Sequence, residues 1–272
     1  MFFLPLFDDN ATRTTPIITW IILAICICVF FWQQSLPHPQ SYYALLEYGV
    51  IPNRLLVQGE LFTITGISAI ITSMFLHGGW MHLIFNMLYL WVFADNIEDA
   101  MGRVKFILFY LLCGFCAALS QALIDPSSTI PMIGASGGLA GILGAYMMIH
   151  PRAAIRVLMV ILIFIRFISL PAWLVLGVWI AGQFVSASGS ADGAGGVAYF
   201  AHIGGFIAGA VLAPFFIHKD IKLFGKGMPA DTRRWSTNPV AFTDVKSEAK
   251  QRYRRKSGGS VPSYRRKKGP WG

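Results

Sequence analysis

The chain carries a series of long apolar runs that contain almost no charge, and these runs limit the folds open to it. Charged residues, Pro or Gly bound each run. The runs cover about residues 17–32, 82–94, 106–124, 136–149, 155–185 and 197–217. Inside a bilayer no water pairs with backbone N–H and C=O groups, so such runs cross it as helices. The composition agrees, since 55% of the 272 residues are hydrophobic and only 13% are charged.

The number of spans depends on the run at 155–185, which is too long for one straight crossing and too short for two. Arg166 and Pro171 fall within it, so we expect an interfacial segment at about 155–168 and a crossing at about 170–186. The sequence thus predicts an all-α membrane protein, a polytopic bundle of six transmembrane helices with a long outer first loop. Residues 61–76 are also apolar and uncharged, and composition alone leaves a seventh span open there.

The basic residues predict the orientation. With six spans both termini lie on one side of the membrane, and all of the 22 Lys and Arg except Arg54 fall on that side. Because basic residues gather in cytoplasmic loops, we expect both termini in the cytoplasm and the protein in the plasma or inner membrane. Residues 1–218 then form the membrane domain, and residues 219–272 a basic, largely disordered tail. Its basic clusters favour anionic lipid headgroups over nucleic acid as a partner.

Four polar side chains interrupt the apolar runs at a similar depth. His82 and Asn86 are four residues apart, on one face near the outer end of the second span. Ser136 begins the fourth span just after Gly134, and His202 lies in the outer half of the sixth. One such residue alone most often forms a hydrogen bond between helices, whereas the four together indicate a reactive site.

Small residues offer a way to bring Ser136 and His202 together. They recur on both helices at a spacing that lets two helices approach closely. On the fourth span they are Gly137, Gly141 and Gly144, and on the sixth Ala201, Gly205 and Gly209. We therefore expect the fourth and sixth spans to pack side by side.

A serine beside a neutral imidazole is a nucleophile with its base, so Ser136 and His202 predict a catalytic pair. The start of a helix also offers unpaired backbone N–H groups and the positive end of the helix dipole, which suit a developing oxyanion. His82 and Asn86 can add side-chain donors. No Asp or Glu falls at this depth, so we expect a dyad with no acidic third member.

The set His82-x-x-x-Asn86, Gly134-x-Ser136-Gly137 and Ala201-His202 resembles the motifs of the rhomboid intramembrane serine proteases, over about residues 17–218. The resemblance implies that Ser136 is the nucleophile and His202 the general base and acid, with an acyl-enzyme intermediate. It implies that His82, Asn86 and the Ser136 amide form the oxyanion site. It also assigns residues 61–76 to the first outer loop and Asp95–Gly102 to a short turn after the second span.

Two positions depart from the family pattern. The Trp-Arg pair that some members carry in the first loop is absent, with Ser68 and Ala69 near its place. An aromatic residue that in some members follows the nucleophile by four positions is Ala140 here. Whatever stacks against His202 must therefore come from elsewhere in the chain. Both departures bear on substrate preference and base orientation, and neither removes a catalytic group.

The expected substrates are single-span or polytopic membrane proteins, cut in the outer part of a transmembrane segment after a small side chain. We expect the loop at 186–196 to move as a gate beside the fifth helix. A transporter would be expected to carry a mid-depth carboxylate, which the predicted spans lack. A metal-dependent protease would be expected to carry a His-Glu-x-x-His sequence, which is also missing, so we expect no metal and no cofactor. The remaining alternative is a catalytically inactive rhomboid-like protein that binds transmembrane clients without cutting them.

Overall fold

The computed structural model describes residues 2–161, 164–189 and 198–225, which belong to one compact unit, Met1–Ala230. Its helices are α1 (Ile17–Ser35), α2 (Gln40–Tyr48), α3 (Ile64–Ser73), α4 (Trp80–Met101), α5 (Arg103–Ile124), α6 (Ser136–Ile149), α7 (Ala172–Gly189) and α8 (Tyr199–Phe216). Its strands are β1 (Phe2–Asp8), β2 (Ala154–Ile161) and β3 (Phe164–Pro171), and two short helical turns, η1 (Asn53–Val57) and η2 (Glu60–Phe62), precede α3.

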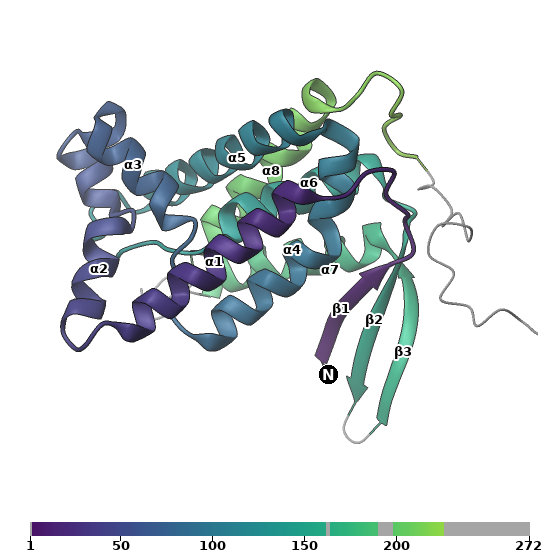
Figure 1. Ribbon diagram of the computed structural model, residues 1–272, viewed down its shortest axis with the longest axis horizontal. Helices are drawn as coiled ribbons and strands as arrows, with labels where there is room; N and C mark the ends of the chain where they lie inside the picture. The colour runs from purple at the N-terminus through teal and green to yellow at the C-terminus, as the bar shows by residue number, and fades with distance from the viewer. Residues whose placement is uncertain (1, 162–163, 190–197, 226–272) are drawn as a thin grey trace, which may run out of the picture. The chain divides into compact units, whose positions relative to one another are not determined.

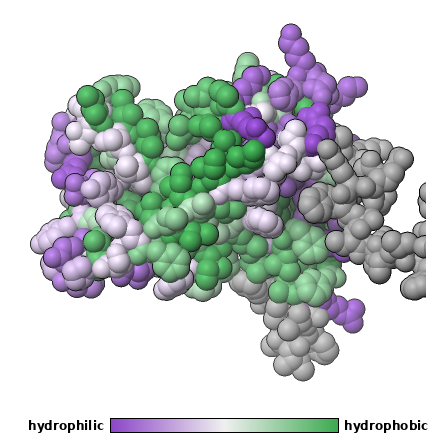
Figure 2. Space-filling view, in the orientation of Figure 1, coloured by the Kyte–Doolittle hydropathy of each residue, from purple (hydrophilic) through white to green (hydrophobic). Residues whose placement is uncertain are grey.

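The helices follow the apolar runs of the sequence. The six helices α1, α4, α5, α6, α7 and α8 each fall on one of the expected crossings. Of the described helices, α1, α5 and α8 are long and apolar enough to cross a membrane, and α6 and α7 are shorter apolar helices. Apolar side chains cover the middle of the visible face, and hydrophilic ones gather toward its two ends (Figure 2). The protein is thus a helical membrane bundle.

Helix α6 lies at the centre of this bundle. Its residues from Gly138 to Tyr146 are all buried, and it packs against α4, α5 and α8. A Cβ atom built on Gly209 of α8 would overlap the backbone of Gly141, and α8 is as close to the start of α6 at Gly205. The close approach expected from the small residues is therefore confirmed, and it holds the first turn of α8 beside the first turn of α6.

Helix α4 runs further than expected. The prediction of a short turn at Asp95–Gly102 was wrong, because residues 95–101 form the last turns of the helix, which ends at Met101 and is followed by Gly102 with a φ of 78°. The polar side chains of these turns have partners there. Glu98 accepts hydrogen bonds from two backbone N–H groups in the first turn of α1, and Asp99 pairs with Arg13 at 3.0 Å. They hold the start of the first helix, which satisfies donors that would otherwise lack partners.

A three-stranded antiparallel sheet, in the order β1-β2-β3, lies at the end of the bundle away from α2 and α3 (Figure 1). The segment expected to be interfacial at 155–168 thus forms most of a hairpin, and the N-terminal strand pairs with it. Side chains alternate along β2: Ile155 and Val157 are buried in the main core, while Arg156 is exposed and pairs with Asp9 at 3.1 Å. Burial on one face explains why this apolar segment forms strands.

The apolar segment at 61–76 contains η2 and α3. With 10 residues, α3 is about 15 Å long, half the thickness of the hydrocarbon core, so it is too short to be a seventh span. At the other end of the chain, the segment after α8 returns to the bundle, where the backbone N–H of Phe224 donates to the carbonyl of Met148 at 2.7 Å. Residues 226–272, and with them most of the tail expected to be disordered, lie outside the described residues.

Candidate active site

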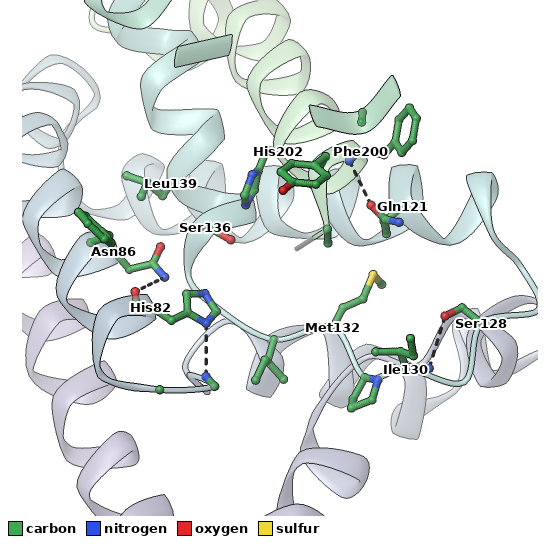
Figure 3. A pocket seen from close by; sticks show the side chains of 18 of the residues that line it. His82, Asn86, Gln121, Ser128, Ile130, Met132, Ser136, Leu139, Phe200 and His202 are labelled. Atoms are coloured by element: carbon green, nitrogen blue, oxygen red, sulfur yellow. Dashed lines mark hydrogen bonds between the residues drawn. The ribbon is translucent and has the colours of Figure 1, made fainter. Parts of the chain in front are cut away.

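A cavity of about 1240 Å³ opens among α4, α5, α6, α7, α8 and the segment that precedes α6. His82, Asn86, Ser136 and His202 all line it, so the structure brings together the four side chains that the sequence singled out. Figure 3 shows them around one space, with the imidazole of His202 pointing toward the hydroxyl of Ser136. Three helices contribute these groups: α4, α6 and α8.

Ser136 is the first residue of α6, and the backbone before it is shaped by Gly134. That glycine has a φ of 120°, which favours glycine, and its N–H donates to the carbonyl of Ser73 at 2.8 Å. A Cβ atom at Gly134 would lie 2.6 Å from Nε2 of His82, so a larger residue has no room there. Among the described residues no side chain caps α6, and its first backbone N–H groups are therefore available to a ligand in the cavity.

Two side chains of the first turns of α4 face Ser136. His82 accepts a hydrogen bond at Nδ1 from the backbone N–H of Gly78 at 3.3 Å (Figure 3). In the neutral ring the proton then sits on Nε2, the atom next to Gly134, which makes His82 a donor toward the site. Asn86 is buried and uses one amide hydrogen to bond the carbonyl of His82 at 3.0 Å, which leaves its second amide hydrogen for another acceptor.

A second histidine lies behind His82. His77, in the turn before α4, is buried and its ring centroid lies 5.1 Å from that of His82. Burial, together with the neighbouring His82, lowers the pKa of His77 to about 4. A neutral His77 adds no positive charge beside the donor at His82, and it was not singled out from the sequence because its position in the turn showed no relation to Ser136.

His202 stands in the first turn of α8, and two other helices fix it. The first turn of α8 contacts Gln121 of α5, whose side-chain oxygen accepts a hydrogen bond from the backbone N–H of Phe200 at 3.1 Å (Figure 3). The imidazole itself contacts α7, where Trp179 has its ring centroid 5.8 Å away at an interplanar angle of 37°. Nδ1 of His202 lies 2.7 Å from Oε1 of Gln183. The stacking partner expected from elsewhere in the chain is therefore Trp179.

Sequence reasoning missed both glutamines and the tryptophan. A signal was present for the glutamines, since Gln121 and Gln183 are uncharged polar residues inside apolar helices, where each needs a partner. One carboxylate, Asp125, does line the cavity, and its oxygen accepts from Ser127 at 3.0 Å. Among the residues that the structure describes, no three His, Cys, Asp or Glu side chains are placed to hold a metal ion.

A serine at the start of a buried helix, a histidine on the neighbouring helix and side-chain donors on a third define a hydrolase-like site inside a helical membrane bundle. A family model, the rhomboid domain, matches residues 65–219, which is more than half of the chain. The chain therefore belongs to the rhomboid family.

Several relatives agree with this assignment. The chain is 32% identical to rhomboid protease GluP of Bacillus subtilis over 130 residues, which cover 48% of this chain and 24% of that protein. It is 29% identical to mitochondrial rhomboid protein 1 of Saccharomyces cerevisiae over 210 residues, or 75% of this chain and 54% of that protein. The putative rhomboid protease YdcA of B. subtilis is 32% identical over 78 residues, 29% of this chain and 39% of that protein. The matches thus span between about a quarter and about half of each relative.

Proposed function

We propose that the protein is an intramembrane serine endopeptidase that cuts transmembrane segments of membrane-protein substrates by a Ser136/His202 dyad. The observation that carries the proposal is the meeting of Ser136, His202, His82 and Asn86 at one cavity, with the imidazole of His202 aimed at the serine. Membership of the rhomboid family and the protease names of its relatives support the same activity.

The chemistry follows from the placement of these groups. The hydroxyl of Ser136 attacks the scissile carbonyl while Nε2 of His202 takes its proton. The oxygen of the tetrahedral intermediate accepts hydrogen bonds from Nε2–H of His82, the second amide hydrogen of Asn86 and the backbone N–H of Ser136. His202 then gives its proton to the leaving amine. The amine departs, and the acyl group remains on Ser136 as the acyl-enzyme. A water molecule activated by His202 releases the second product and restores the serine.

The position of the site suggests where a substrate is cut. Ser136 begins its helix, so it lies near one face of the bundle rather than at mid-depth. A helical substrate has its carbonyls hydrogen-bonded, and it must unwind locally before Ser136 can attack. We infer cleavage in the outer part of the substrate's span, and the family resemblance implies a small side chain just before the cut.

The orientation remains a proposal that rests on charge. Arg13 and Arg156 contact residues at the sheet end of the bundle, while Arg54 donates a hydrogen bond to the carbonyl of Leu46 in α2. Basic residues favour the cytoplasm, so the sheet end and both termini are cytoplasmic in the plasma or inner membrane, and the cavity opens outward. Labelling of single cysteines at positions 54 and 152 in intact cells tests this. Labelling of position 152 alone would contradict the orientation.

The activity is tested with a fluorophosphonate probe, which reacts with activated serines. The purified protein should be labelled, and Ser136→Ala should not. A matched control is Ser35→Ala, which removes an exposed hydroxyl at the end of α1 that bonds only the carbonyl of Trp32 among the described residues. Folded wild-type protein that binds a transmembrane client but takes no label would instead indicate the inactive, client-binding alternative.

A further inference from the structure

His202, the base of the dyad, has a hydrogen-bond partner on α7, a helix that carries none of the site residues predicted from the sequence. Nδ1 of His202 lies 2.7 Å from Oε1 of Gln183, and the amide nitrogen of Gln183 lies 3.4 Å from the carbonyl of Trp179. That carbonyl can only accept a hydrogen bond, so it fixes the amide nitrogen on its side and turns the amide oxygen to His202. An amide oxygen also only accepts, so Nδ1 must donate to it.

This bond determines which nitrogen of the imidazole is free. With its proton held at Nδ1, the neutral ring carries its lone pair on Nε2, the form that can take a proton from a serine hydroxyl. Carboxylate and asparagine partners hold the histidine in the same way in serine and cysteine proteases. Here a neutral glutamine amide occupies that place.

Trp179 restrains the orientation of the imidazole plane of His202. It is four residues before Gln183, so both side chains leave the same face of α7. Its ring contacts His202 and also Phe206, one turn further along α8, at a centroid distance of 6.2 Å. Ala140, which is buried where α6 packs closely against α8, has no ring for this contact. The stacking partner of His202 therefore comes from α7.

We propose that Gln183 is a positioning residue for the reaction, which holds His202 in the Nδ1–H form against the ring of Trp179 so that Nε2 faces Ser136. This inference rests on the proposed function. Helix α7 then belongs to the catalytic apparatus, although none of its residues donates to the oxyanion. A displacement of α7 would release the imidazole and lower the rate without removing any reacting group.

The test measures kcat and KM for a transmembrane substrate in detergent, and the pH profile of kcat/KM, for three variants. Gln183→Leu keeps the size of the side chain but removes the acceptor, which leaves a buried Nδ1–H without a partner. We expect kcat to fall about 10-fold to 10²-fold with KM nearly unchanged. Gln183→Glu keeps an acceptor, and its negative charge favours the imidazolium, so kcat should recover at alkaline pH while the acidic limb of the profile moves up by about 1 unit or more.

The control is Val185→Leu, which places the same new side chain on the exposed face of the same helix. It should match the parent in kcat and in pH profile. Equal melting temperatures of all variants would separate positioning from folding. A Gln183→Leu protein with the kcat of the parent, or a Gln183→Glu protein with the parent's pH profile, would overturn the role of Gln183. Failure of the parent to cut would instead refute the proposed function itself.

Discussion

The contact between α6 and α8 gives a quantitative prediction for Gly209→Ala. A Cβ atom on Gly209 would lie 2.5 Å from the Cα atom of Gly141, and ordinary contacts of this kind begin near 3.4 Å. The opposing atoms belong to a helix backbone and cannot turn aside. The carbonyl oxygen of Gly141 lies closer still, so the two helices must separate by at least about 1 Å, and overpacking of this kind costs about 1–3 kcal/mol of stability.

The same separation of the helices should also displace His202 in the active site. His202 lies seven residues before Gly209 on α8, about 10 Å along the helix axis. A displacement of catalytic groups by about 1 Å can lower a rate as much as 10²-fold, so we expect the labelling of Ser136 by the fluorophosphonate probe to slow at least about 10-fold.

The assay compares thermal unfolding and labelling rate in detergent for Gly209→Ala and a matched variant, Gly182→Ala. A Cβ atom on Gly182 of α7 meets nothing within 4 Å, and alanine is the better helix former, so this variant should be as stable as the parent or slightly more so. If Gly209→Ala melted and reacted like Gly182→Ala, the close contact of α6 and α8 would not hold His202 in place, and the reasoning would fail.

Two further predictions concern the oxyanion site and the N-terminal strand. Asn86→Ala should keep the melting temperature of the parent yet lose about 10²–10³ in kcat, because it removes one donor to the oxyanion; unchanged turnover in a folded variant would show that Asn86 is structural only. Burial raises the pKa of Asp8 to about 8, so the folded protein retains a proton there that the unfolded chain releases near 3.8. Stability should therefore fall as the pH rises from about 4 to about 8, and Asp8→Asn should remove that part of the pH dependence; equal slopes for the variant and the parent in pH-dependent melting would contradict it.

Most helices of the bundle could be predicted from the sequence, because the bilayer acts on each apolar run separately. An apolar run such as 106–124 must satisfy its own backbone hydrogen bonds, so it is helical whatever surrounds it. The glycines of α6 and α8 carry a second kind of information, since small residues at matched positions indicate which helices touch. From these two signals the proximity of Ser136 and His202 could be inferred from the sequence alone.

The features that the sequence did not reveal depend on partners far away in the chain. Strand β1 forms only because Phe2–Asp8 meets β2 about 150 residues later, and nothing in either segment alone indicates that pairing. The extension of α4 depends on donors for Glu98 in the first turn of α1 and on Arg13 as the partner of Asp99. Gln183 looked like an isolated polar residue in an apolar helix, and its meaning depends on the rotation of α7 that places it against His202.

The central claim is that Ser136 and His202 act together to cut a membrane-embedded peptide bond. The most direct measurement is mass spectrometry of the products when a panel of single-span substrates is incubated with the wild type, Ser136→Ala and His202→Ala. The account predicts wild-type cuts in the outer part of the span, after small side chains, and intact substrate with both variants. Cuts in the inner half of the span, or cuts that persist in both variants, would contradict it.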